Sequence, residues 1–121
     1  MPARSAEDCL RDILDAVRDI QVFTRGMAEE SFLALPSGDR RTYRAIKNAV
    51  AEIGEAVKGL PSEICARHPA VDWRGLAGLR DILSHRYFVV DLLRLWPVLR
   101  DELPVLRKAA ESELTLGTKT S

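Results

Sequence analysis

Cysteine and histidine, which organise many small disulfide-linked or metal-binding proteins, are scarce in this chain of 121 residues. It has two cysteines, Cys9 and Cys65. Neither belongs to a Cys-x-x-Cys pair or stands at zinc-ligand spacing from a histidine. A disulfide framework and a zinc motif are therefore not expected, and we predict two buried, reduced thiols with no metal or other cofactor.

Long apolar runs and an excess of charge are also missing. No stretch approaches the ~18 apolar residues of a membrane span. The first residues lack the apolar core of a signal peptide, so we expect a soluble, cytoplasmic protein without a membrane partner.

Because 18 basic residues balance 18 acidic ones, net charge gives no sign of nucleic-acid binding. The length fits one domain over residues 1–121, with a flexible tail from about residue 115.

Apolar residues recur at helical spacing in two long segments. Ser5 is expected to cap the first helix, with Asp8 as a weak capping-box partner and Gly26 at or just past its end. Asp39 is expected to cap the second, which stops at Gly59. The first stripe consists of Leu10, Ile13, Leu14, Val17 and Ile20, and the second of Tyr43, Ile46, Ala49 or Val50, Ile53 and Val57.

Shorter helical segments complete the pattern. Residues 29–35 and 61–67 favour short helical pieces, and Asp72 is expected to cap a helix that contains Trp73, Leu76, Leu79, Ile82 and Leu83. Residues 87–90 favour an extended stretch or a tight turn. Asp91 then caps a helix with a stripe of Leu92, Leu95, Trp96 and Leu99, Pro104 breaks or kinks it, and residues 105–114 continue helically. We find no strand, so the sequence predicts an all-α, up-and-down bundle of four or five helices. Trp73, Trp96, Phe23 and Phe32 are assigned to its core.

The two histidines stand in different contexts. His68 precedes Pro69 in a polar loop and is expected to be solvated. His85 lies beside Arg80, Ser84, Arg86 and Tyr87 near the end of an apolar helix. Spacing alone leaves a second interpretation open, because cations are also favoured at any helix C-terminus by the macrodipole.

The run from Val71 to Asp91, VDWRGLAGLRDILSHRYFVVD, closely resembles the signature of HepT-like HEPN proteins. The upstream segment 49–57 resembles the second long helix of that family, and Trp96 and residues 103–106 fall where the family has Trp and a Leu-Pro pair. The similarity extends from about Cys9 to Leu114. It implies a HEPN-like bundle that forms homodimers.

The resemblance also implies a function. Active members are metal-independent endoribonucleases. Many are toxins of toxin–antitoxin pairs, and a MntA-like nucleotidyltransferase antitoxin disarms these by attaching AMP to a motif tyrosine. Carried over, Arg80 and His85 are catalytic, Asp81 and Ser84 are supporting residues, and Tyr87 is the AMPylation site.

Two alternatives remain at this point. One is a catalytically inactive HEPN partner of a nucleotidyltransferase, since Asp81 replaces the family's frequent Asn and its negative charge would repel phosphate. The other is a helical dimer with a structural role. Val89, where the family often has Gly, stiffens the turn after Tyr87.

The chemistry of RNA cleavage needs few groups, because the 2′-OH is the nucleophile. His85 can transfer protons near neutral pH, and Arg80 can stabilise the charge that develops on the phosphoryl oxygens. On an ideal helix Arg80 and His85 would point about 140° apart. Either the helix ends or distorts near Ser84, or two copies complete the site across a dimer; we favour the dimer.

Additional cations could contact the RNA backbone. Arg40, Arg41, Arg44 and Lys47 cluster at the start of the second long helix, and Arg86 lies inside the motif. A solvated helix face is the preferred interpretation of the first four, and RNA contact is the alternative.

Overall fold

The computed structural model describes residues 4–83 and 88–120, with side chains described for residues 4–83 and 91–117. All regular structure in this part of the chain is helical, which confirms the predicted all-α class. The elements are α1 (Ala6–Phe23), α2 (Glu29–Leu33), α3 (Arg40–Lys58), α4 (Ser62–Arg67), α5 (Trp73–Ala77), α6 (Leu79–Ile82), α7 (Phe88–Pro97), the π-helical turn η1 (Val98–Glu102) and α8 (Leu103–Thr120).

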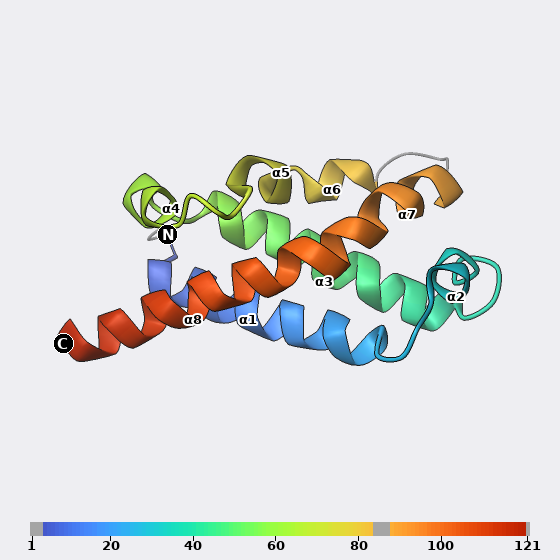
Figure 1. Cartoon of the computed structure of the whole chain (residues 1–121), viewed down its shortest axis with the longest axis horizontal. Coiled ribbons are helices and arrows are strands. Elements are labelled where there is room, and N and C mark those ends of the chain that lie inside the picture. The colour runs from blue at the N-terminus through green and yellow to red at the C-terminus, as the bar shows by residue number, and fades with distance from the viewer. Residues whose placement is uncertain (1–3, 84–87, 121) are drawn as a thin grey trace.

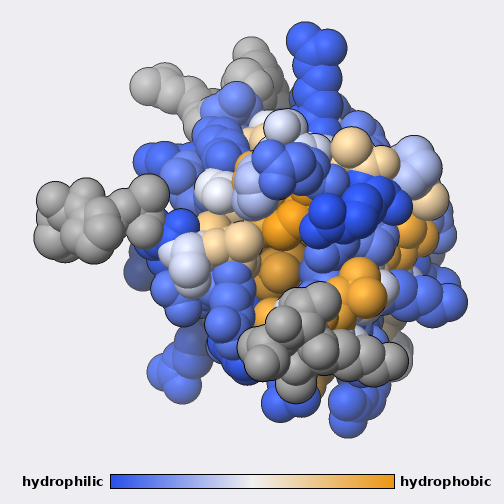
Figure 2. Space-filling model, turned by 90° about the vertical axis from the view of Figure 1, so that its left-hand side faces the viewer, coloured by the Kyte–Doolittle hydropathy of each residue, from blue (hydrophilic) through white to orange (hydrophobic). Residues whose placement is uncertain are grey.

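The long elements run back and forth along one axis (Figure 1). α1 and α3 are antiparallel, α5 and α6 return along α3, and α7, η1 and α8 cross back over α1 and α3. α1 begins and α8 ends at the end of the bundle that carries α4. Figure 2 views this end and shows apolar residues at its centre, surrounded by hydrophilic ones. The up-and-down arrangement predicted from the sequence is confirmed.

Three predicted N-caps are present. The Ser5 side chain accepts a hydrogen bond from the Asp8 N–H, Asp39 from the Thr42 N–H and Asp72 from the Gly75 N–H, each at 3.1 Å. Each cap satisfies a backbone donor that the helix itself leaves unpaired. The local sequence therefore sets where α1, α3 and α5 begin.

The predicted apolar stripes form the core. Every member of the α3 stripe is buried, and of the α1 stripe only Leu14 is partly exposed. Phe32 is fully buried and packs on Trp96 with ring centroids 4.8 Å apart, and the partly buried Trp73 packs against the core. The assignment of Phe23 to the core was wrong. Phe23 is the last residue of α1, where the chain leaves the helix for a turn at residues 24–26, and its side chain is 36% exposed.

The helix predicted after Asp72 is divided in two. α5 ends at Ala77, and Gly78, with φ −90° and ψ 5°, links it to α6, which ends at Ile82. Gly75 and Gly78 weaken a continuous helix because glycine has a low helix propensity. The helix that carries Arg80 therefore ends at Ile82, before Ser84, and the orientation of Arg80 relative to His85 stays a prediction because His85 lies outside the described residues.

The prediction that Asp91 caps a helix was wrong. α7 already begins at Phe88, so Asp91 lies inside it and is only 4% exposed. Burial, together with the negative charge of Asp91, raises the pKa of the Tyr43 phenol on α3. Residues 88–90 are helical rather than extended, whereas Tyr87 lies outside the described residues.

Pro104 does not break the last helix. The Leu103 N–H donates to the Val98 carbonyl oxygen, the hydrogen bond of a π turn, and the chain continues directly into α8. A wider turn just before a proline accommodates a ring that lacks an N–H and would crowd an α-helical turn. The backbone of α8 is helical to Thr120, beyond the end predicted near Leu114.

Candidate active site around Arg80

Arg80 is presented by a single helical turn that packs against α3. The neighbouring side chains of Leu76 and Leu79 are each 1% exposed and anchor α5 and α6 in the core. On α3, a Cβ added at Gly54 would already lie 3.5 Å from the carbonyl oxygens of Leu76 and Ala77. The α3 backbone at Gly54 therefore lies close to the link between α5 and α6, at a distance where one added carbon would make ordinary van der Waals contact.

This approach brings Arg80 next to Glu55, the residue after Gly54. Arg80 Nη1 lies 3.4 Å from Glu55 Oε1, a long hydrogen bond within an ion pair. Glu55 Oε1 also lies 3.7 Å from Lys58 Nζ. The Arg80 side chain remains 66% exposed, so its guanidinium is accessible from solvent.

A groove of about 600 Å³ lies beside this ion pair, between α1 and α3. Small residues and the Cys9 thiol form part of its lining, and polar or charged side chains from α1, α3, α6 and the residues before α1 form the rest. Its lining residues are Arg4, Cys9, Asp12, Asn48, Ala51, Glu52, Glu55, Ala56, Gly59 and Arg80. Arg80 therefore stands at the boundary between a defined groove and open solvent.

The other predicted motif residues are divided between described and undescribed parts of the chain. Asp81 is exposed next to Arg80. Ser84, His85, Arg86 and Tyr87 lie outside the described residues, which reach Leu83 on one side and resume at Phe88. The pairing of Arg80 with His85 and the position of Tyr87 thus stay predictions.

The basic cluster occupies the opposite end of α3. Arg40, Arg41 and Arg44 are exposed, and none of them forms an ion pair with another described residue. Lys47 is partly buried, with Nζ 5.2 Å from the centre of the Tyr43 ring. At 1.5 Å per residue, Arg40 is about 20 Å from Glu55 along the helix. Within this end of α3, the positive charge of Arg40 partly opposes the rise that burial and Asp91 cause in the pKa of Tyr43.

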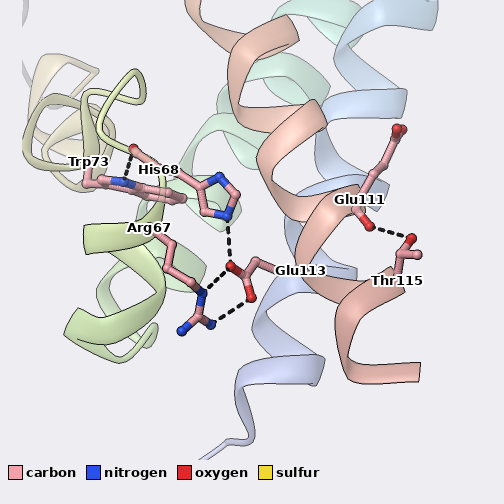
Figure 3. Close-up of polar contacts among 6 residues, drawn as sticks. All are labelled: Arg67, His68, Trp73, Glu111, Glu113 and Thr115. Carbon is pink, nitrogen blue, oxygen red and sulfur yellow. Dashed lines mark hydrogen bonds and ion pairs between the residues drawn. The ribbon is translucent and has the colours of Figure 1, made fainter. Parts of the chain in front are cut away.

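His68 is not the solvated loop residue that the sequence predicted. Its side chain is 19% exposed, and Nε2 lies 2.8 Å from Oε1 of Glu113 in α8 (Figure 3). Glu113 is buried and also accepts two hydrogen bonds from Arg67, each 2.8 Å long. The hydrogen bonds from Arg67 and then His68 outweigh burial and lower the pKa of Glu113 to about 2. Sequence reasoning missed this cluster because Glu113 is 45 residues from His68.

The cluster of Arg67, His68 and Glu113 has a structural role just before the segment that contains Arg80. The Trp73 indole N–H donates to the His68 carbonyl oxygen at 3.0 Å, which ties the loop before α5 to the start of that helix. Through Glu113, the same loop is fixed to α8.

In the described part of the chain, no group of three or more potential metal ligands occurs. None of its helices combines the length and hydropathy needed to cross a bilayer.

Comparisons with known proteins identify the family. The model of the family described as Ribonuclease HepT-like matches residues 13–113. The chain is 39% identical over 104 residues to the "Probable ribonuclease HepT" of Thermococcus cleftensis, covering 86% of this chain and 91% of the relative. It is also 39% identical over 115 residues to a protein of Methanocaldococcus jannaschii that bears the name "Putative RNase", with 92% and 88% covered. No solved structure matches the chain.

The matched region contains the helices from within α1 to within α8, the Arg80 turn and the cluster around Glu113. The chain therefore belongs to the Ribonuclease HepT-like family.

Proposed function

We propose that this protein is a metal-independent endoribonuclease, the toxin of a toxin–antitoxin pair, with Arg80 and His85 as its catalytic residues. The observation that carries the proposal is the exposed Arg80 guanidinium, which the last described helical turn before residues 84–87 presents to solvent. His85 follows five residues later in the sequence. Relatives that cover most of this chain bear ribonuclease names, which supports the same reaction.

The reaction uses the 2′-OH of RNA as the nucleophile. One imidazole accepts its proton while the oxygen attacks the adjacent phosphorus, and the bond to the leaving 5′-oxygen breaks as that oxygen gains a proton. Arg80 donates hydrogen bonds to the phosphoryl oxygens as negative charge builds on them. The products are a 2′,3′-cyclic phosphate and a 5′-hydroxyl.

A homodimer is part of the proposal, because it supplies a second histidine. With two copies of His85 near one cleft, one can act as base and the other as acid. The end of α6 at Ile82 supports a turn of the backbone there, so the motif need not stay on one helical face. A monomeric mass at micromolar concentration in light scattering would contradict this arrangement.

RNA backbone contacts are proposed for Arg86, Arg40, Arg41, Arg44 and Lys47. The exposure of the three arginines supports this role, because phosphate contacts need accessible cations. Lys47, held over the Tyr43 ring, is a less accessible member of the set. Binding of RNA should weaken with salt, and the salt dependence should decrease in the triple Ala variant of the arginines.

Control by an antitoxin is proposed at Tyr87. A MntA-like nucleotidyltransferase would attach AMP to its hydroxyl, and the added phosphodiester could pair with Arg80 in place of the scissile phosphate. Incubation with a cognate MntA-like nucleotidyltransferase and ATP, followed by peptide mass spectrometry, tests this. AMP at another residue, or AMP-dependent neutralisation of a Tyr87→Phe variant, would contradict the assignment.

The test of the activity is cleavage of RNA by purified protein in EDTA. We expect Arg80→Ala and His85→Ala to lose at least about 10²-fold. Arg74→Ala is the matched control, since Arg74 is an exposed arginine on the neighbouring α5. Full activity of either motif variant, or loss of wild-type cleavage in EDTA, would refute the mechanism.

One observation favours a second candidate, an inactive binding partner of a nucleotidyltransferase. Asp81 is exposed directly beside Arg80, where its negative charge opposes an approaching phosphate. This candidate predicts stable co-purification with the nucleotidyltransferase but no RNA cleavage by wild type. It also predicts that Asp81→Asn gains cleavage.

A further inference from the structure

Glu55 is the described acidic group paired with the Arg80 side chain. The two residues come from different helices, α3 and α6, which pack against each other beside Gly54. The contact joins one carboxylate oxygen to one guanidinium nitrogen, Nη1. To described residues, Arg80 Nε and Nη2 make no hydrogen bond.

This geometry divides the guanidinium into two sides. The fork has five N–H donors in one plane, so a carboxylate at Nη1 leaves the edge formed by Nε and Nη2 for another planar or tetrahedral oxyanion. An unpaired arginine side chain would sample many rotamers. A partner on one side therefore reduces the orientations that the free edge can adopt.

We propose that Glu55 is a positioning residue that orients Arg80 toward the scissile phosphate. The role rests on the proposed ribonuclease function, and Glu55 acts through Arg80 without contact with RNA. Lys58, 3.7 Å from the same Glu55 oxygen, offsets the negative charge that Glu55 places near the phosphate. Glu55 is thus held between two cations, one of which is the proposed catalytic arginine.

Glu52, one turn earlier on α3, provides a matched control. It lines the same groove and carries the same charge, yet its Oε1 accepts a hydrogen bond from Asn48 at 3.4 Å and Arg80 is not its partner. Replacing Glu52 by Gln removes one negative charge from the groove without removing the partner of Arg80. An effect confined to Glu55 therefore reports orientation rather than general electrostatics.

The experiment measures kcat and KM on a single-stranded RNA oligonucleotide for wild type, Glu55→Ala, Glu55→Gln and Glu52→Gln. We expect Glu55→Ala to lower kcat about 10-fold, because small misplacements of a catalytic group reduce the rate strongly. KM should change less than about 2-fold, and Tm by no more than a few degrees, as for an exposed ion pair. Glu55→Gln, which keeps an acceptor oxygen, should recover part of the rate, and Glu52→Gln should match wild type.

A double-mutant cycle separates positioning from a structural role. If Glu55 acts through Arg80, adding Glu55→Ala to Arg80→Ala should cause no further loss of kcat. Independent, multiplicative losses would overturn the proposal, as would an unchanged kcat in Glu55→Ala or an equal loss in Glu52→Gln. A wild-type protein that cleaves no RNA overturns the proposed function and this role together. An active wild type with any of the other adverse results overturns the role of Glu55 alone.

Discussion

Arg67 and Glu113 form an ion pair with two hydrogen bonds, although 46 residues separate them. Arg67 Nε and Nη2 each lie 2.8 Å from a different oxygen of the Glu113 carboxylate, whose side chain is only 5% exposed. His68 Nε2 approaches the same carboxylate (Figure 3). The contact joins α4 and its following loop to α8, and it makes Glu113 the most strongly perturbed carboxyl group among the described residues.

The stability of the protein should therefore depend on the ionisation of Glu113. Its pKa falls from the usual 4.5 to about 2 in the folded state, so the ionised carboxylate stabilises the fold fully above pH 4.5. That contribution, about 3 kcal/mol, is lost as the pH falls from 4.5 toward 2. In urea unfolding at a series of pH values, Glu113→Gln should lower the free energy of unfolding near neutral pH and flatten its acid decline.

Glu111→Gln is the control for this prediction. Glu111 lies on the same helix but is exposed and pairs with Arg107 on the surface. Its replacement should leave the acid decline almost as steep as in wild type. Parallel pH curves for wild type and Glu113→Gln would contradict the role assigned to Glu113.

Phe32 should be the main anchor of the five-residue helix α2. It is fully buried and packs on Trp96, so Phe32→Ala should cost about 3–5 kcal/mol of unfolding free energy through lost burial and a cavity. Phe23→Ala should cost less than about 1 kcal/mol, because Phe23 is already 36% exposed. Chemical denaturation of both variants measures the difference. A loss of unfolding free energy in Phe32→Ala as small as that in Phe23→Ala would contradict the role of Phe32 as the anchor of α2.

The Asp72 cap should stabilise the helix that leads to Arg80. Asp72→Ala removes the acceptor of the Gly75 N–H and should cost about 1 kcal/mol, whereas Asp72→Asn should be almost neutral. Amide hydrogen exchange provides a local readout. The Gly75 amide should exchange faster in Asp72→Ala than in Asp72→Asn, and unchanged exchange would mean that the cap is dispensable.

The two thiols should react slowly in the folded protein. Cys9 is 2% exposed, and burial raises the pKa of the partly buried Cys65 thiol, which lowers its thiolate fraction near neutral pH. Iodoacetamide labelling followed by mass spectrometry should find Cys65 modified more slowly than a cysteine in a peptide, and Cys9 more slowly still. Both should react readily in urea. Rapid labelling of Cys9 under native conditions would indicate that α1 opens.

Much of the fold was determined locally by the sequence. The stripes of α1 and α3 have helical spacing, and Ser5, Asp39 and Asp72 each accept the backbone hydrogen bond that their position predicted. These features depend on residues within a few positions of one another, so a sequence pattern contains them. The motif around Arg80 was also evident from the sequence alone, and its similarity to HepT-like proteins agrees with the family match.

Other features were decided only by tertiary structure. Asp91 has the residue type of a cap, but α7 begins earlier and buries it near Tyr43. His68 pairs with Glu113, and Arg80 with Glu55, across separations of 45 and 25 residues that no local pattern encodes. The physical reason is the same in each case. The free energy of a buried or paired charge depends on which distant groups the packed helices bring within a few ångströms, and that distance exists only in the folded chain.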